Sequence, residues 1–372
     1  MRNRQDDMNE NRRGEGENLR VRKTKFELLR IICMLFVITE HLLPNISDIQ
    51  NISAGFEYYI ANIVRSFCIV AVNCFVLLSG YFGIKMKVKR IFRLDAVVWF
   101  WGITGLVLAT VTGMNVLQVK KDILYLFPII TKRNWFVTTY IVLYLISPIL
   151  NFVIEKLNKR QFQSLILLLV SIFYFIPTID YTLNAPTVTL DSGYGIVNFV
   201  CLYFIGRYIN LYLGNIKKVY ARLGYFLSCI LLFAANHIMS ILVGFYFNTY
   251  ISYDTIFCLA GAVSLFLWFR ELHLQSQMIN RIARYSFAAF IIHTSPFYGG
   301  VVYEISAKIS ANSMLLYIVV LVVTPVLVYG LSIGLEFIRQ KLFRKMENMM
   351  ITKITENKFV LTFENQMKEF NG

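Results

Sequence analysis

Charged residues are scarce in this sequence. Only 16% of its 372 residues are charged, whereas 57% are hydrophobic. A soluble domain is about 45–50% apolar and about 25% charged, so the composition excludes an ordinary soluble protein. Apolar runs of about 20 residues, the length that a helix needs to cross a bilayer, recur along the whole chain. We therefore predict an all-α, polytopic integral membrane protein.

The chain also lacks paired cysteines and metal-binding patterns. Neither a CxxC motif nor a Cys/His pattern with the spacing of a metal site is present. Isolated thiols within apolar runs are typical of packing residues. We therefore expect no metal and no redox site. The six cysteines all stand singly in such runs: Cys33, Cys68, Cys74, Cys201, Cys229 and Cys258.

The first 25 residues lack the features of a cleaved signal peptide. They are polar and basic, without an apolar central region or a small-residue cleavage site, and we predict a disordered cytoplasmic arm. The net charge of +15 does not indicate nucleic-acid binding. The Lys and Arg residues lie in short clusters between apolar runs, where they set membrane topology. No nucleic-acid partner is expected.

Apolar runs of membrane-spanning length define the expected organisation. We predict about ten spans in one bundle, with no long soluble domain between them. The domain plan is an arm at 1–25, a membrane domain at 26–338 and a basic cytoplasmic tail at 339–372. The predicted spans are 27–45, 60–82, 94–113, 135–154, 162–178, 194–213, 222–245, 251–270, 285–303 and 314–337.

Basic clusters alternate with connections that contain little Lys or Arg. Because Lys and Arg are retained on the cytoplasmic side, this alternation predicts that both termini are cytoplasmic. The connection 114–134 is an exception, since it is basic on the expected outer side, and its middle is a candidate interfacial or re-entrant segment. The clusters assigned to the cytoplasm are 85–93, 156–160, 217–222, 270–284 and 339–350.

The first span, "ELLRIICMLFVITEHLL", carries four ionisable residues: Glu27, Arg30, Glu40 and His41. Such groups are costly inside a bilayer and usually functional. Eleven residues advance a helix by about 16 Å and about three full turns, so Arg30 and His41 share a face, and Glu27 can pair with Arg30. His41 is a candidate general base. The alternative is that Arg30 snorkels to lipid headgroups and His41 marks the interface.

Three other features are candidates for a site. Arg90 and Arg93 form an R-x-x-R pair that could grip a phosphate, although a basic loop is also explained by topology alone. Ser79 and Gly80 follow an apolar run and favour close helix packing. His293 lies mid-span and is expected to face protein.

Arg65 and the aromatic residues complete the set of candidates. Arg65 lies inside the second span and needs a partner, for which Glu40 and Glu57 are candidates. Aromatic residues near the outer side suit either sugar stacking or an interfacial belt. They are Tyr58, Tyr59, Trp135, Tyr181, Tyr194 and Tyr246.

Several of these fragments occur together in one order. They are Glu27-Leu-Leu-Arg30 with His41 after ten more residues, "FVLLSGYF", R-x-x-R, "NWFVTTYIVLYLISPILN" and "YSFAAFIIH". In this order, over roughly residues 24–340, the chain resembles the membrane acyltransferase-3 family. More narrowly, it resembles the members that O-acetylate bacterial surface polysaccharides.

The resemblance implies a role for each matching position. His41 would be the catalytic histidine with Arg30 as its essential partner, and Arg90 and Arg93 would bind the acyl-coenzyme A donor. The serine–glycine pair and the late histidine, at 79–80 and 293, match supporting positions. Glu27 stands where an Asp is common, which keeps the charge. No hydrolase domain of the type fused to some members is expected after the last span.

Together, these observations predict a multi-pass enzyme of the bacterial inner membrane that moves an acetyl group from acetyl-coenzyme A to a hydroxyl of a surface polysaccharide or lipid-linked glycan. His41 would act as general base, with Glu40 or Arg30 tuning its charge. Succinyl or another short acyl group is an alternative, and an acetyl-histidine intermediate stays open. The rival hypotheses are a sugar exporter, disfavoured by the lack of internal symmetry, and a non-catalytic scaffold or sensor.

Overall fold

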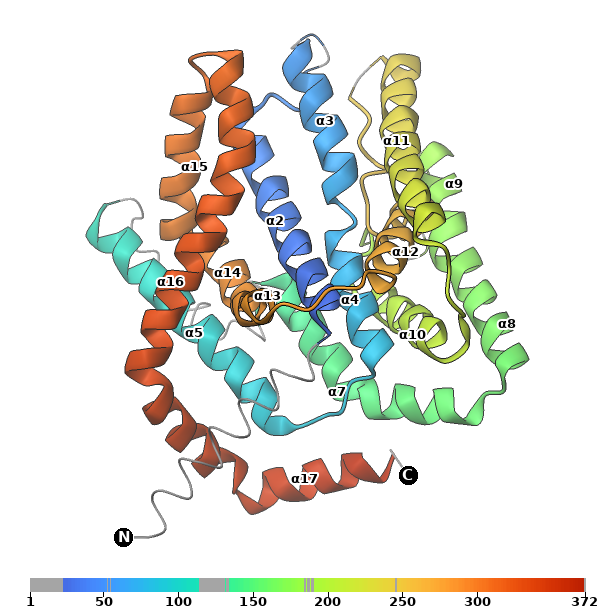
Figure 1. The fold of residues 1–372 in the computed structure, drawn as a ribbon, viewed down its shortest axis with the longest axis vertical. Helices are drawn as coiled ribbons and strands as arrows, with labels where there is room; N and C mark the ends of the chain where they lie inside the picture. Colours follow the sequence, from blue (N-terminus) through green and yellow to red (C-terminus); the bar gives the residue numbers. More distant parts are fainter. Residues whose placement is uncertain are drawn as a thin grey trace.

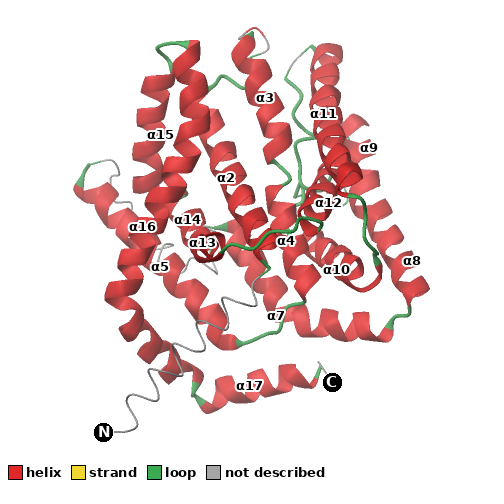
Figure 2. Ribbon diagram, viewed as in Figure 1, coloured by secondary structure: helices red, strands yellow, loops and turns green. Residues whose placement is uncertain are grey.

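A computed structural model describes residues 23–51, 53, 55–113, 131, 134–183, 185, 188, 191–244 and 246–370. Most of the predicted arm, 1–22, and most of the connection 114–134 lie outside these residues. Within the described part the chain is built from helices and contains no strand (Figure 2). The predicted all-α, polytopic membrane fold is therefore confirmed.

The helices are arranged side by side in a bundle (Figure 1). In the first half they are α2 (Thr24–Ile46), α3 (Phe56–Cys68), α4 (Ala71–Phe82), α5 (Val88–Val111), α7 (Trp135–Lys156), α8 (Lys159–Val170), η3 (Ser171–Phe175) and α9 (Ile176–Leu183). In the second half they are α10 (Ile196–Tyr212), α11 (Lys218–Val243), α12 (Ile256–Arg270), α13 (Gln277–Ile282), η4 (Ala283–Tyr285), α14 (Ser286–His293), α15 (Pro296–Ser310), α16 (Met314–Thr355) and α17 (Lys358–Glu369).

Six of the described helical segments are long and apolar enough to cross a membrane, and the helices α10 and α12 are shorter but also apolar. The segments include two composite ones, α3 with α4 and α8 with η3 and α9. The count of ten spans stays a prediction. The six segments are Phe56–Phe82, Val88–Val111, Trp135–Lys156, Lys159–Leu183, Lys218–Val243 and Met314–Thr355.

The predicted span 285–303 is not one helix, which corrects the sequence-based assignment. Helix α14 ends at His293, and α15 begins at Pro296. Between them, Ser295 has an extended backbone with φ −71° and ψ 141°. A proline disfavours helical geometry at the preceding residue but suits the first turn of a new helix. Pro296 therefore ends one helix and starts the next, which places His293 at a helix end.

Helix α16 extends well beyond the predicted span 314–337. It continues to Thr355, so the predicted tail begins inside a helix and includes α17. Figure 1 shows α17 lying crosswise beneath the lower end of the bundle. There Glu364 Oε2 accepts a hydrogen bond from the Val88 N–H at 3.1 Å, and Lys89 Nζ donates to Thr352 Oγ1 at 3.2 Å. The C-terminal helices thus hold the first turn of α5.

Helix α2 lies in the middle of the bundle (Figure 1), where it contacts α3, α4, α12, α13, α14, α15 and α16. Several of its apolar side chains, among them Leu29, Cys33 and Ile38, are fully buried. Polar side chains on a central helix are shielded from lipid, because they contact the surrounding helices rather than hydrocarbon.

Helices α4 and α10 approach each other most closely at two glycines. A Cβ added at Gly80 would overlap the backbone of Tyr203, and one added at Gly206 would overlap the backbone of Leu77 and Tyr81. Small residues allow helix backbones in a membrane to pack this closely. Gly80 therefore has a packing role, and it positions Ser79 on the neighbouring face of α4.

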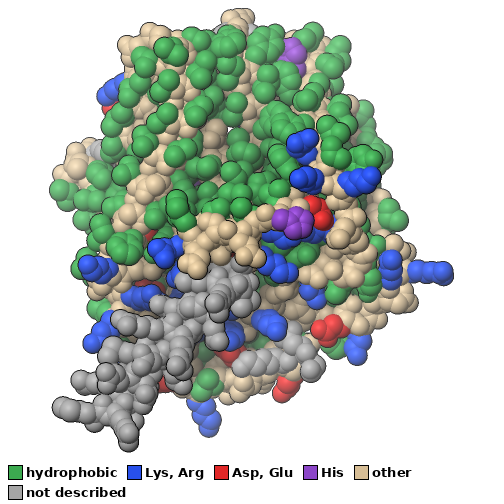
Figure 3. All heavy atoms as spheres, in the orientation of Figure 1, with side chains coloured by type: hydrophobic (Ala, Val, Ile, Leu, Met, Phe, Trp, Pro, Cys, Tyr) green, Lys and Arg blue, Asp and Glu red, His purple; other side chains and the backbone are tan. Residues whose placement is uncertain are grey.

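The visible face of the molecule is divided by charge. Lys and Arg side chains gather in its lower half, whereas hydrophobic side chains cover most of the upper half (Figure 3). The connections 83–87 and 213–217 and the residues after 338 lie toward the same end as α17 (Figure 1). The division is the pattern expected for a membrane protein whose basic connections share one side.

Candidate active site

A cavity of about 470 Å³ lies between α2, α4, α5, α7 and the segment formed by η4 and α14. Its volume is within the range of about 300–1,000 Å³ typical of small-molecule sites. Apolar and aromatic side chains form most of its wall, and polar side chains enter it from several of these helices. The polar lining residues are Glu27, Arg30, Ser79, Arg90, Arg93, Tyr140, Tyr144, Arg284 and Ser286.

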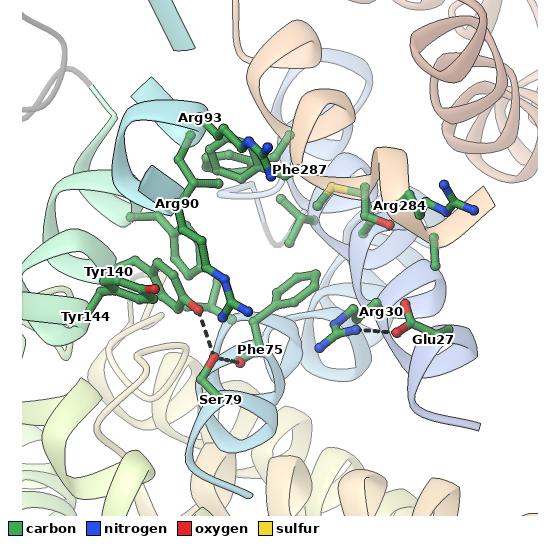
Figure 4. Close-up of a pocket in the computed structure, with 18 residues that line it drawn as sticks. Glu27, Arg30, Phe75, Ser79, Arg90, Arg93, Tyr140, Tyr144, Arg284 and Phe287 are labelled. Atoms are coloured by element: carbon green, nitrogen blue, oxygen red, sulfur yellow. Dashed lines mark hydrogen bonds and ion pairs between the residues drawn. The ribbon is translucent and has the colours of Figure 1, made fainter. Parts of the chain in front are cut away.

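Four arginines contribute to this cavity: Arg30, Arg90, Arg93 and Arg284. In Figure 4, Arg30 and Arg90 extend from opposite walls toward the space between them. Arg30 Nη1 pairs with Glu27 Oε1 at 2.6 Å, as the sequence spacing predicts. Among the described residues, no carboxylate lies within ion-pair distance of the other three. The cavity therefore has an excess of positive charge, which suits an anionic ligand with several phosphates.

The connection that leads into α5 is held in place by hydrogen bonds from α7. Tyr144 Oη accepts from the Lys87 N–H at 2.9 Å and donates to the Lys85 carbonyl at 3.1 Å. One turn earlier on α7, Tyr140 Oη lies 3.2 Å from Ser79 Oγ. The contacts made by Tyr144 and Glu364 fix the start of α5, and they therefore also fix where its arginines point.

The two histidines predicted as site residues are in contact with each other. His41 Nδ1 lies 2.8 Å from His293 Nε2, and the ring centroids are 5.0 Å apart. His293 is buried with 2% exposure, whereas His41 is exposed. The buried imidazole is therefore the fixed partner, and the exposed one has a face open to a substrate.

A backbone carbonyl determines how protons are arranged in this pair. His293 Nδ1 lies 2.7 Å from the carbonyl oxygen of Ala289. A carbonyl only accepts, so Nδ1 of His293 carries the proton and donates. In the neutral ring Nε2 is then an acceptor, and Nδ1–H of His41 donates to it. This leaves the lone pair on Nε2 of His41, the atom that can act as a base.

The cavity and the histidine pair lie along the same two helices. On α2, Arg30, Met34 and Val37 line the cavity, and His41 follows Val37 by four residues on the same face. On the facing segment, Phe290 lines the cavity one turn before His293. The arginines therefore lie at one end of this arrangement and the histidines beyond its apolar end.

Glu40 faces away from the histidine pair. Its Oε2 lies 3.5 Å from Arg65 Nε, so Glu40 is the partner of Arg65, as one of the two sequence alternatives predicts. Arg65 Nη1 also donates to Tyr246 Oη at 2.9 Å. Successive residues on a helix point about 100° apart, which explains why Glu40 and His41 meet different helices.

Sequence reasoning missed Arg284 as a member of the site. It follows the short helix α13 and reaches the cavity beside α14, which carries His293 nine residues later. The spacing is similar to that of Arg30 and His41 on α2, so each of two adjacent segments carries an arginine toward the cavity and a histidine toward the pair. That repeated Arg–His order was a signal available in the sequence.

Comparison with protein families identifies one match. The model described as an acyltransferase domain matches residues 24–333, which is most of the chain. Neither the curated proteins nor the solved structures gave a match. The matched range begins at the first residue of α2 and ends within α16, so it includes the cavity, its arginines and both histidines. The chain therefore belongs to the membrane acyltransferase-3 family.

Proposed function

We propose that this protein is an O-acetyltransferase that moves the acetyl group of acetyl-coenzyme A to a hydroxyl of a bacterial surface polysaccharide or lipid-linked glycan. The observation that carries the proposal is the His41–His293 pair, which leaves Nε2 of His41 unprotonated beyond the apolar end of an arginine-lined cavity. Family membership supports acyl transfer rather than sugar export.

The cavity supports binding of an acyl-coenzyme A. Coenzyme A has a phosphate-rich end and a long, less polar arm that carries the thioester. Arg90, Arg93 and Arg284 would hold the phosphates through charge-assisted hydrogen bonds. The apolar wall formed by Met34, Val37 and other residues would contain the arm. With its phosphates at the arginines and its arm along the apolar wall, coenzyme A would present the thioester toward His41.

His41 would then remove a proton from the acceptor. Nε2 of His41 takes the hydroxyl proton while the oxygen attacks the thioester carbonyl carbon. The carbon–sulfur bond breaks, and the sulfur leaves with the proton from His41 to give free coenzyme A and an O-acetyl ester. His293 accepts the Nδ1–H bond throughout and holds the ring in the reactive tautomer.

The proposed location is the inner membrane with both termini on the cytoplasmic side. The basic surface and the arginine-lined part of the cavity support this orientation, because acetyl-coenzyme A is made in the cytoplasm. A succinyl or other short acyl donor would use the same chemistry, and the length of the acyl group would be selected near the apolar end.

The test uses purified protein, radiolabelled acetyl-coenzyme A and the O-acetyl content of surface polysaccharide from cells. We expect deletion of the gene to remove the O-acetyl signal, wild-type protein to restore it, and His41→Ala to fail. In purified His41→Ala protein, the rate of acetyl transfer should fall by about 10²–10⁴-fold, the usual contribution of a positioned base.

His237→Ala is the matched control, since His237 lies on α11 near Tyr58 and outside the cavity. It should keep wild-type activity. A His41→Ala protein with the normal rate would contradict the proposed mechanism. Transfer from succinyl-coenzyme A at a higher rate than from acetyl-coenzyme A would change the proposed donor.

A further inference from the structure

Two further cavities lie between α5, α14, α15 and α16. One, of about 170 Å³, is bounded by α14, α15 and α16, and the other, of about 380 Å³, is bounded by α5, α15 and α16. Tyr298 and Leu335 line both, so the two cavities adjoin and form one groove, which we call the α15–α16 groove. Its lining residues and those of the arginine-lined cavity do not overlap. The groove is therefore a separate feature that the mechanism above does not use.

The groove opens toward lipid. Helices α5 and α16 are long and apolar enough to cross a membrane, and both expose large apolar side chains along the groove. Val107 is 52% exposed, Leu331 is 64% exposed and Leu342 is 67% exposed. Exposed apolar side chains on a membrane-spanning helix contact hydrocarbon rather than water. A hydrocarbon chain can therefore enter the groove from the bilayer, whereas a coenzyme with several phosphates cannot.

One end of the groove reaches a balanced group of charges. Arg339 lines this end, but its guanidinium donates to both oxygens of Glu336 and to Glu347. Two carboxylates balance one guanidinium, so this end does not favour a phosphate. The side chains around it are mostly apolar. This part of the groove suits the chain of a lipid rather than its headgroup.

The other end of the groove reaches the histidine pair. His293 lines it together with Tyr303, whose Oη is buried and has no hydrogen-bond partner among the described residues. Ser295 Oγ, two residues after His293, is buried in the same way and also has no partner there. A buried hydroxyl without a partner costs free energy. The two hydroxyls therefore indicate that a polar group of a ligand lies beside His293.

We propose that the α15–α16 groove holds the hydrocarbon chain of a lipid-linked glycan, and that this lipid-linked form is the acceptor. The polar linkage between chain and glycan lies at Tyr303 and Ser295, and the sugar meets the exposed face of His41. This inference rests on the proposed function. It selects one of the two proposed acceptors, the lipid-linked glycan rather than the free polysaccharide.

The direction of the groove fits a lipid of the outer leaflet. From His293 the groove follows α16 toward Arg339, and the residues after 338 lie toward the basic end of the bundle (Figure 1). That end is cytoplasmic in the proposed orientation. A lipid in the outer leaflet has its head outward and its chain toward the centre of the bilayer. Its head therefore meets the histidine pair while its chain follows the groove, and acetylation precedes release of the glycan from its carrier.

The experiment compares one glycan in two forms. Lipid-linked glycan is extracted from a strain that lacks the gene, and mild acid releases part of it from its carrier as free glycan. Full-length protein in lipid nanodiscs then receives radiolabelled acetyl-coenzyme A with either form. We expect the KM for the lipid-linked form to be at least about tenfold lower, because burial of about two methylene groups is enough for this factor.

Filling the groove should remove this preference. Val107→Trp and Leu335→Trp each place a large ring in the groove and should raise the KM for the lipid-linked form about tenfold. Their KM values for free glycan and for acetyl-coenzyme A should not change. Val107 is exposed, so its variant remains informative if Leu335→Trp fails to fold.

The matched controls are Val111→Trp and Leu327→Trp. These side chains lie on the same two helices, are 78% and 58% exposed, and line neither cavity of the groove. Both variants should keep the wild-type preference for the lipid-linked form.

Tyr303→Phe tests the polar end of the groove. It should raise the KM for the lipid-linked form several-fold, because the hydroxyl no longer bonds the linkage. The midpoint of thermal unfolding of the ligand-free protein should not fall, since this hydroxyl has no hydrogen bond within the described protein to lose. A lower midpoint would show that the hydroxyl serves the fold and would contradict its assignment to the ligand.

The outcomes separate this inference from the proposed function. Equal KM values for the two forms contradict the inference and leave the proposed function standing. A preference that both groove variants keep arises from partition into the membrane alone and also contradicts it. A phospholipid that copurifies with wild-type protein but not with Leu335→Trp, together with equal KM values, assigns the groove to a structural lipid instead. Wild-type protein that binds acetyl-coenzyme A but acetylates neither form contradicts the proposed function itself.

Discussion

At the scale of single residues, the proposed chemistry depends on which nitrogen of the His41 imidazole keeps its lone pair. His293 donates to a backbone carbonyl in its own helix, and this one contact decides the tautomers of both histidines. Asp performs the equivalent task in many hydrolase triads. Here a neutral ring replaces the carboxylate, which suits a position with 2% exposure because no charge has to be buried.

His293 should therefore act as a positioning residue. His293→Leu removes the acceptor for Nδ1–H of His41, and the loss of this hydrogen bond should lower kcat by about 5- to 150-fold. His293→Gln offers an amide oxygen at a similar distance and should recover part of the rate. Acetyl-coenzyme A binding to the purified protein checks that the cavity is intact. Equal rates for the Leu and Gln variants would contradict this role.

The arginines at the start of α5 should determine donor affinity. Replacing Arg90 and Arg93 together by Ala should raise the Kd for acetyl-coenzyme A, because a hydrogen bond to a charged group contributes about 1.5–3 kcal/mol. The expected increase is at least about tenfold for each arginine. Equilibrium binding to purified protein gives the measurement.

The control for this experiment removes two positive charges from the connection that immediately precedes α5. Lys85 and Lys87 are exposed and do not line the cavity. The double variant Lys85→Ala/Lys87→Ala should therefore bind the donor normally. A similar loss of affinity for acetyl-coenzyme A in the two double variants would show that overall positive charge, rather than contact in the cavity, attracts the donor.

At the scale of helices, α5 is held against α16 by a buried polar network. Arg339 forms two hydrogen bonds of 2.8 Å with Glu336 and one of 2.9 Å with Glu347. Trp101 on α5 donates its indole N–H to Glu336 Oε2 at 2.7 Å. The Glu336 and Arg339 side chains are only 2% and 5% exposed. This network fixes the tilt of α5 and thereby the position of its arginines.

Breaking this network should destabilise the protein. Glu336→Leu leaves a buried arginine with fewer partners and an unsatisfied indole N–H, and loss of one partner from a buried pair costs about 3–5 kcal/mol. The midpoint of thermal unfolding in detergent should fall clearly. Glu336→Leu/Arg339→Met removes both charges and should recover part of the loss.

An exposed ion pair provides the comparison. Glu304 and Lys308 form a 2.6 Å pair on α15, with side-chain exposures of 59% and 72%. Exposed pairs contribute about 0–1 kcal/mol, so Glu304→Leu should change the unfolding midpoint little. A larger loss in Glu304→Leu than in Glu336→Leu would contradict the assignment of the buried network.

At the scale of the whole molecule, the distribution of charge predicts the orientation in the membrane. The connection 213–217 lies toward the basic end of the bundle, and the turn between α15 and α16 lies at the opposite end (Figure 1). Reporter fusions after Lys217 and after Ala311 should therefore report the cytoplasm and the outside, respectively. Reporters that give the same side for both positions would contradict the proposed orientation of the donor site.

Local patterns determined much of this protein from sequence. The apolar runs predicted membrane helices, because each run is long enough to cross a bilayer as a helix. Helical spacing predicted that Glu27 pairs with Arg30 and that Arg30 and His41 share a face. Pro296 also marked the break between α14 and α15, although the apolar run 285–303 by itself predicted one span.

Only the tertiary structure decided which helices meet. His41 and His293 are 252 residues apart in the sequence. Arg65 pairs with Glu40 because α3 packs on α2. Arg284 reaches the cavity because η4, which carries it, packs beside α2. The spacing of side chains along one helix is set by its turn of about 3.6 residues. Contacts between helices depend instead on the combined packing of many side chains from different parts of the sequence. The sequence alone therefore predicted His41 and the two arginines of α5 as candidate site residues, and the packing of the helices determined which residues lie beside them.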